Sequence, residues 1–550
     1  MKMMLARVRR IGALTVIALS LFACSDWFID EQQLMRNASE YLAERKINAA
    51  AIELRNILQE NPNHAEARYL LAGINLDFGD YATAEKEYRH ARSAGWNEVD
   101  VAYGIARSQL LMGDFRDVLE DAEVQDSWPV AVRASLLSLR AMAEAGLGRR
   151  DEALSLLELA RQLDTDSLEV LRTGIKLQIV YGSIAETGKL LQQALERYPD
   201  DPELLLLQAS IASQDELAAT QAIYQRVVDM DPRGFISTNG RLARLRLAQL
   251  QMLDRNYKAA AATLKPLFGR DANDPFTNYL GGVLAVVQAD YKRAAQLLLK
   301  VLKLVPEHNP TRLLYGTVNF AEKNYEQAAY FLSKYVTAVP DNLDARKLLA
   351  RSYILLDRYE DASKTLKSEL TSETNDAELL ALVGVSELNR GETAAGIVGL
   401  ERAVNVDPDS VAIRGELAKA YIEAGETGLA ISQLKTILAQ GGEQRQTEIL
   451  LILAHLQAGE HTKAIGLALD LVKQDPDQPA VNALAGNVFA ASGDLPEARI
   501  YFMRAIEKQP GFPPAVMALA HVEEQDGNYA EASRLYKQLV DTGMESVLPM

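Results

Sequence analysis

The stretch "GDYATAEKEYRHA", residues 79–91, has a turn pair, an aromatic residue, a small residue three positions later and a bulky residue four after that. The same order returns in "KNYEQAAYFLSKYV" from Lys323, "DRYEDASKTLKSEL" from Asp357 and "GNYAEASRLYKQLV" from Gly527. A pattern that returns in this way indicates repeats, which have to be identified before any other feature of a fold.

The repeat distance is 34 residues. Steps of 34 from Tyr257 define nine consecutive units, and the aromatic slot is Tyr in five of them. The position nine residues before that slot is small in eight of the nine units, with Ile452 as the exception. The position three residues after the slot is small in all nine: Ala260, Ala294, Ala328, Ala362, Gly396, Ala430, Ala464, Ala498 and Ala532.

These slots predict a pair of helices in each unit. Apolar residues recur at steps of three and four, which is typical of one face of a helix. The two small positions allow the backbones to approach closely, and the aromatic residue lies between neighbouring hairpins. Proline at 306, 340, 408, 476 and 510 marks the end of each second helix, because it cannot continue one.

The period and the slot chemistry resemble the tetratricopeptide repeat, although the usual Trp near the start of each unit is absent. The resemblance implies an all-α, right-handed superhelical solenoid of about 15 helix-turn-helix units. We expect about six units over residues 31–232 and nine over 241–546, followed by a tail at 547–550. Between the arrays, "RGFISTNG" at 233–240 exceeds the period by about six residues and is predicted to be a joint.

Residues 1–23 differ from the repeats. Lys2 and three arginines precede 13 uncharged residues, too few to span a membrane. The run ends in "LFAC" at 21–24, which resembles a bacterial lipoprotein signal. This resemblance implies lipid attachment at Cys24, the only cysteine, a linker at 24–30 and, because Ser25 follows, an outer-membrane location facing the periplasm. The alternative is an ordinary cleaved signal peptide with an incidental cysteine.

The chain is acidic, with 58 Lys and Arg against 75 Asp and Glu and a net charge of −17. Without residues 1–23 the balance is 54 against 75. Such a surface repels phosphate backbones, so we expect no nucleic-acid partner.

No HExxH, Walker-type loop, GxGxxG after a strand or GxSxG elbow occurs, so we predict a protein that is not an enzyme and needs no cofactor or metal. Binding remains. Helix positions that would line the concave groove predict a peptide site at Phe276, Tyr279, Val283, Leu313, Phe320, Lys347 and Arg351. The alternative is a superhelix that closes on itself, so that this face packs internally.

Residues 38–96, which begin "ASEYLAERKINAAAIELRN", and "GDFRDVLED" at 113–121 resemble tetratricopeptide lipoproteins of the exosortase/PEP-CTERM sorting and exopolysaccharide loci of Gram-negative bacteria. This resemblance covers roughly residues 24–125 and implies a scaffold that binds envelope proteins of an export or sorting system. Scaffolding of outer-membrane protein or pilus assembly, a periplasmic enzyme and a structural spacer are the alternatives.

Overall fold

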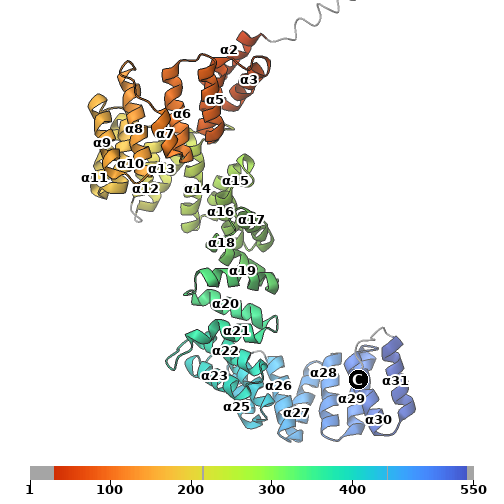
Figure 1. The fold of residues 1–550 in the computed structure, drawn as a ribbon. Coiled ribbons are helices and arrows are strands. Elements are labelled where there is room, and N and C mark those ends of the chain that lie inside the picture. Colours follow the sequence, from red (N-terminus) through yellow and green to blue (C-terminus); the bar gives the residue numbers. More distant parts are fainter. Residues whose placement is uncertain (1–29, 213–215, 443, 542–550) are drawn as a thin grey trace, which may run out of the picture. The chain divides into compact units, whose positions relative to one another are not determined.

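The computed structural model describes residues 30–212, 216–442 and 444–541. Within these residues the fold consists of thirty α-helices and one short 3-10 helix, with no strands (Figure 1). The prediction of an all-α solenoid of helical hairpins is therefore confirmed. The predicted signal, Cys24 and the tail at 547–550 lie outside the described residues.

The chain forms two compact units that meet at residues 306 and 307. The described part of the first unit contains sixteen of the helices: α2 (Glu31–Ala43), α3 (Ile47–Glu60), α4 (Ala65–Phe78), α5 (Tyr81–Ser93), α6 (Glu98–Met112), α7 (Phe115–Asp121), α8 (Val130–Gly146), α9 (Arg150–Leu163), α10 (Leu168–Tyr181), α11 (Ile184–Arg197), α12 (Pro202–Ile211), α13 (Leu217–Met230), α14 (Thr238–Leu253), α15 (Tyr257–Arg270), α16 (Pro275–Val287) and α17 (Tyr291–Leu304).

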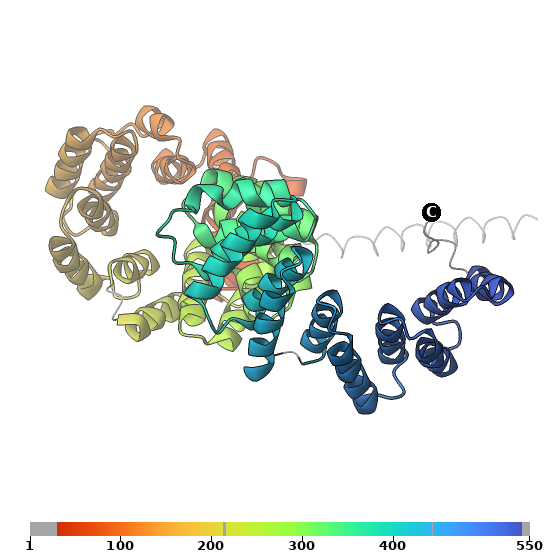
Figure 2. The same ribbon diagram turned by 90° about the horizontal axis from the view of Figure 1, so that it is seen from below.

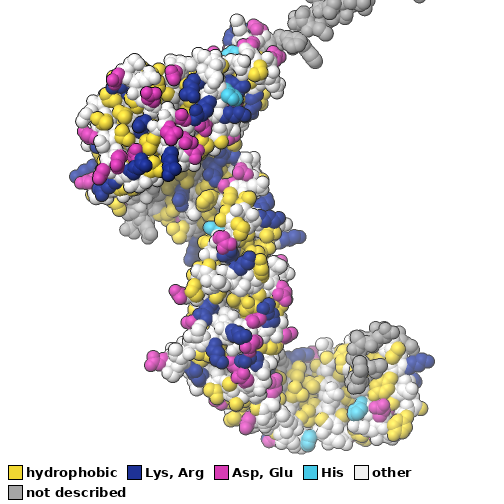
Figure 3. All heavy atoms as spheres, viewed as in Figure 1, with side chains coloured by type: hydrophobic (Ala, Val, Ile, Leu, Met, Phe, Trp, Pro, Cys, Tyr) yellow, Lys and Arg dark blue, Asp and Glu magenta, His cyan; other side chains and the backbone are white. Residues whose placement is uncertain are grey.

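The described part of the second unit contains the remaining fourteen: α18 (Asn309–Ala321), α19 (Tyr325–Ala338), α20 (Leu343–Ile354), α21 (Tyr359–Leu366), α22 (Ala377–Asn389), α23 (Thr393–Val406), α24 (Val411–Glu423), α25 (Thr427–Ala439), α26 (Gln444–Gln457), α27 (His461–Gln474), α28 (Pro479–Ala491), α29 (Leu495–Lys508), α30 (Pro513–Gln525) and α31 (Tyr529–Asp541). A 3-10 turn, Lys367–Glu369, follows α21. Acidic and basic side chains are interspersed on the visible surface of both units (Figure 3).

The core of a hairpin is a contact between residues 16 positions apart. The first is the small residue of the first helix, and the second is the bulky residue of the second helix. A Cβ atom added to Gly282 would lie 2.6 Å from Leu298 Cδ2, which leaves no room for a side chain. The same size relation holds for Ala248 with Leu264, Gly316 with Leu332, Ala350 with Leu366, Gly384 with Leu400 and Ala418 with Leu434.

Two hairpins show that the sum of the two sizes matters. Ile452 is the one large residue in the small slot, and the residue 16 positions later is Ala468, which packs in the same cluster. In the next hairpin the bulky residue is Phe502, fully buried, and it faces Gly486. Large and small residues exchange places, so that the pair still fills the space between the two helices, as dense packing requires.

The turns also follow the sequence pattern. Between the helices of most described hairpins, one residue has a positive φ, such as Gly493 at 85° or Lys323 at 61°. Between hairpins, Pro306 and its equivalents stand two residues after a helix end, as predicted.

The usual Trp is absent near the start of each hairpin. In several hairpins a polar side chain at the fourth position donates a hydrogen bond to a carbonyl of the preceding turn. Arg68 Nε donates to the Pro62 carbonyl at 2.8 Å, and Arg414 Nε donates to the Pro408 carbonyl at 2.9 Å. Asn482 makes the same bond to the residue six positions earlier.

The size relation predicts a rescue between Gly486 and Phe502. We expect Gly486→Ile to cost about 3 kcal/mol by overpacking, and Phe502→Ala alone to cost about 3–5 kcal/mol by leaving a cavity. The double variant reproduces the Ile452–Ala468 pair of the preceding hairpin, so it should be clearly more stable than either single variant. Urea unfolding followed by circular dichroism tests this, and simply additive losses would contradict the pairing.

Candidate functional site

In the first unit, ion pairs connect the first helices of separate hairpins. Arg107 on α6 pairs with Glu169 on α10 at 2.8 Å and with Glu203 on α12 at 3.2 Å. Glu203 also pairs with Lys176, and Arg172 Nη1 lies 3.4 Å from it. Helices of non-adjacent hairpins are therefore linked by the chain's own side chains.

This network sets the charge of its members. Burial opposes ionisation of Glu203, but Lys176, Arg172 and Arg107 together lower its pKa to about 2. Arg107 is likewise held charged, because Glu169 and Glu203 raise its pKa despite burial. The cations and carboxylates compensate one another, so the network needs no ligand to complete it.

The second unit has an open groove. Helices α20, α22, α24 and α26 lie in sequence along it, each in contact with the next. The groove has a volume of about 800 Å³, and we call it the α20–α26 groove. It is lined by Arg351, Ile354, Ala377, Glu378, Ala381, Leu382, Val385, Asp407, Ser410, Val411, Ala412, Ile413, Gly415, Glu416, Lys419, Leu434, Ile437, Gln446, Thr447 and Leu450.

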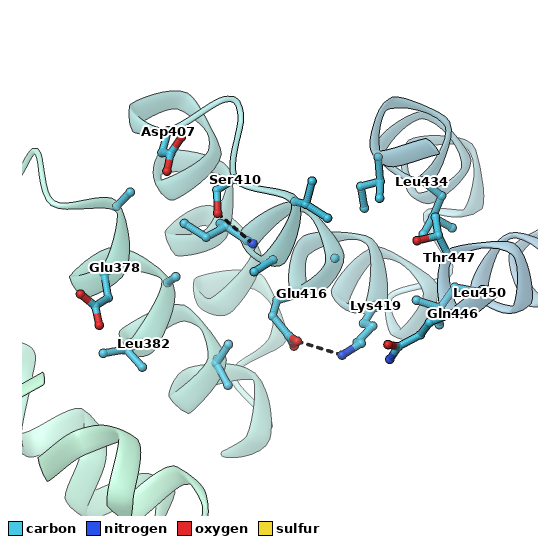
Figure 4. A pocket seen from close by; sticks show the side chains of 18 of the residues that line it. Glu378, Leu382, Asp407, Ser410, Glu416, Lys419, Leu434, Gln446, Thr447 and Leu450 are labelled. Carbon is cyan, nitrogen blue, oxygen red and sulfur yellow. Dashed lines mark hydrogen bonds and ion pairs between the residues drawn. The ribbon is translucent and has the colours of Figure 1, made fainter. Parts of the chain in front are cut away.

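Small residues on two neighbouring helices create the depth of the groove. Ala381 lies on α22, and Ala412 and Gly415 lie on α24. The larger Leu382 and Leu450 also line the groove (Figure 4). A Cβ atom added to Gly415 would meet no atom within 4 Å, so the space above it is open. A side chain of a bound segment therefore has room to enter above Gly415.

The two cations of the lining, Arg351 and Lys419, are already paired. Arg351 Nη2 lies 2.6 Å from Glu378, and Lys419 Nζ donates to Glu416 at 2.8 Å (Figure 4). These pairs keep the net charge of the rim low. An uncharged, apolar occupant therefore meets no unpaired cation at these positions.

Comparison with known proteins identifies the repeats. Two family profiles, both described as tetratricopeptide repeat, match the chain. One covers residues 319–384, and the other covers 35–98, 279–343, 416–479 and 449–513. The chain contains tetratricopeptide repeats. The matches lie in both compact units, and the match to residues 416–479 includes most of α24 and all of α26.

The relatives of these tetratricopeptide repeats are distant. Superkiller complex protein 3 of Mus musculus is 28% identical over 119 residues, which are 22% of this chain and 8% of that protein. The chain thus spans less than a tenth of that relative's length.

Solved structures with similar repeats have low overall similarity. A chain of the APC/C hetero-tetramer Cut9–Hcn1 has 14% identity and a TM-score of 0.34, covering 92% of this chain and 98% of that one. MamA has 20% identity and a TM-score of 0.26, covering 30% and 95%. A tetratricopeptide-repeat protein from Cytophaga hutchinsonii has 18% identity and a TM-score of 0.33, covering 43% and 100%.

The groove residues predicted from the sequence are divided between the two compact units of the tetratricopeptide array. Phe276, Tyr279 and Val283 lie on α16 in the first unit. Phe276 is 67% exposed, whereas the other two are partly buried, and burial raises the pKa of Tyr279.

Leu313 and Phe320 lie on α18 in the second unit and are partly buried. Both pack against a cluster that includes Leu332 of α19. The ring centroid of Phe320 is 5.6 Å from that of Tyr325 in an edge contact. Part of the surface of each side chain is therefore used inside the array.

Lys347 and Arg351, on α20, are brought together by the next hairpin. Lys347 Nζ lies 3.1 Å from Asp376 and 3.0 Å from Glu378. Glu378 also forms an ion pair with Arg351. Burial works against it, yet Glu378 and Asp376 raise the pKa of Lys347. Asp376 in addition caps α22 through the amide of Leu379 at 2.9 Å. The two predicted cations are thus largely neutralised, and Arg351 alone lines the α20–α26 groove.

The site predicted from the sequence does not include Ala381, Ala412 and Gly415. The rule that selected Phe276 and Tyr279, positions two and five of a hairpin, selects these residues when it is applied to the hairpins that begin at 377 and 411. Most residues of the predicted site are large and apolar, whereas the groove forms where the residues are small.

Among the residues described by the structure, no helix is long and apolar enough to span a bilayer. The same residues contain no group of three or more His, Cys, Asp or Glu side chains that could hold a metal ion.

The network of the first unit predicts a pH dependence. The folded pKa of Glu203, about 2, is below its ordinary 4.5, so its stabilisation is present above pH 4.5 and is lost as the pH falls toward 2. We expect Glu203→Gln to cost about 3 kcal/mol at neutral pH and to flatten the loss of stability between pH 4.5 and 2. Denaturant unfolding at several pH values measures this, with exposed Glu158→Gln as the control. Equal slopes for parent and Glu203→Gln would contradict it.

Proposed function

We propose that this chain is a non-enzymatic protein-interaction scaffold whose α20–α26 groove holds an apolar segment of a partner protein. The observation that supports it is an open groove of about 800 Å³ that is lined largely by apolar side chains and whose two cations, Arg351 and Lys419, are paired within the chain. A groove lined by parallel first helices suits peptide recognition, in which apolar side chains of the ligand enter spaces between helices.

The size of the groove limits the segment. Packed helices are about 8–10 Å apart, so four first helices extend over about 30 Å. An α-helix of about 20 residues or an extended segment of about nine covers that distance. Gly415 and Ala381 leave room for branched or aromatic side chains at its centre.

The charge of the second unit favours a basic partner. Residues 307–541 contain 34 Asp and Glu against 22 Lys and Arg. At the groove, Asp407 is exposed, while Arg351 and Lys419 are paired with carboxylates. We therefore propose a partner segment with apolar side chains and at least one Lys or Arg beside Asp407, because such a segment complements the rim.

We further propose that the scaffold is anchored by lipid at Cys24 in the outer membrane, faces the periplasm and supports exopolysaccharide export or exosortase/PEP-CTERM sorting. The supporting observations are "LFAC" at 21–24 and the resemblance over roughly residues 24–125. Its partners would then be envelope proteins of that system.

Filling the groove tests the binding proposal. Gly415→Leu places a side chain in open space, and replacing a helical glycine should gain up to about 1 kcal/mol in helix stability. We expect the variant to fold and to lose at least tenfold in affinity for its partner segment. Proteins cross-linked to the parent in envelope extract are identified first, and the binding of the segment that carries the cross-link is then titrated.

Gly466→Leu is the matched control. Gly466 is an exposed helical glycine of α27 that also has no atom near an added Cβ and does not line the groove. It should bind like the parent. Equal affinity for parent, Gly415→Leu and Gly466→Leu would exclude the groove as the binding site.

Lipid attachment has its own test. Cells that express the parent should incorporate labelled fatty acid into this chain, and Cys24→Ser should abolish the label and release the protein from membranes. Mass spectrometry of the N-terminal peptide checks the site. An unmodified cysteine in the membrane fraction would contradict the anchor.

A further inference from the structure

Residues from Met230, at the end of α13, to Arg270, at the end of α15, contact the first two hairpins of the same compact unit. The partners are 161 to 192 positions apart in the chain. In Figure 2, the helices coloured orange to yellow-green follow a curve that returns toward the first, red helices. The predicted joint at 233–240 lies at the centre of these contacts, so it is part of a tertiary contact as well as a connection.

The apolar part of the contact is Phe235. It is 6% exposed and belongs to the core cluster of α2, α3 and α4, together with Leu34, Leu54 and Leu71. Its ring centroid is 6.1 Å from that of Phe78. The neighbouring Ile236 packs instead on the cluster of α14, α15 and α16. Two consecutive residues thus join two cores.

The polar part consists of side chains that donate to backbone carbonyls. Asn48 Nδ2 donates to Gly234 O at 2.7 Å, and Thr238 Oγ1 donates to Asp77 O at 3.1 Å. Arg45 donates to the carbonyl of Met230. Because carbonyls of the main chain are used, these bonds fix the path of the backbone on both sides.

Arg270 of α15 completes the contact. It donates to the carbonyl of Phe78, and its guanidinium carbon lies 4.4 Å from the centre of the Phe78 ring. Next in the chain, a Cβ atom added to Gly79 would lie 2.8 Å from Thr238 Oγ1. The two segments are therefore in close contact.

We propose that residues 230–238 and Arg270 act as a clasp that closes the first unit into a ring and keeps its N-terminal hairpins folded. In an ordinary solenoid each hairpin contacts only its neighbours, so a terminal hairpin frays first. Here α2, α3 and α4 are held by a segment far along the chain. Opening the clasp would uncover Phe235 and the core surface of α2–α4.

Hydrogen exchange of the full chain, read by mass spectrometry, tests the clasp. Phe235→Ala should accelerate exchange in residues 31–78 by more than about tenfold, because a buried aromatic side chain is removed from their core. Residues 98–146, which make none of the clasp contacts named above, should exchange as in the parent. The matched control is Ile236→Ala, which should accelerate exchange in α14–α16 and leave residues 31–78 unchanged.

A second variant covers the case in which Phe235→Ala disturbs the whole unit. Asn48 is exposed, and Asn48→Ala removes only its bond to the Gly234 carbonyl. It should accelerate exchange in residues 31–78 by about two- to tenfold, as expected for one hydrogen bond. Unchanged exchange there in Asn48→Ala would overturn the clasp, as would equal acceleration by Ile236→Ala and Phe235→Ala.

Discussion

Each hairpin depends on the close approach of its two helices, which is possible only when the two facing side chains have the right combined size. Most hairpins use a small residue first and Leu second. The Ile452–Ala468 and Gly486–Phe502 pairs reach the same result with other residues. Because each pair fills the space between its two helices, neighbouring hairpins stack on one another. The apolar faces that no single hairpin can bury then form a continuous core.

The same repeat produces two different inner faces. In the first unit, Arg107, Glu169 and Glu203 connect the first helices of separate hairpins, so the face is occupied by the chain's own ion pairs. In the second unit, Ala381 and Gly415 leave an apolar groove. A buried and compensated network contributes specificity of shape, whereas an open apolar groove has surface left to bury on binding.

The cations at the α20–α26 groove are paired within the chain, which affects the kind of ligand that can bind there. Lys347 and Arg351 form a cluster with Asp376 and Glu378, so an acidic ligand would have to compete with carboxylates that the chain already supplies. Burial of apolar surface is then the main source of affinity, and charge serves mainly to select a basic partner. The chain would discriminate between partners by their shape and by the sign of their charge.

The sequence by itself determined the helical hairpins, their period, the small and bulky slots and the helix ends, because these depend on contacts within one or two units. Only the tertiary structure decided that Phe235 of the 233–240 joint packs on α2–α4, that Lys347 meets carboxylates 29 and 31 residues later, and that the groove lies over Gly415. For Lys347 and Gly415 the physical reason is the packing of neighbouring hairpins, which decides which side chains of adjacent first helices face one another. For Phe235 the physical reason is curvature. A small rotation from hairpin to hairpin accumulates over many units. The total rotation decides which distant side chains meet, and no local sequence pattern specifies it.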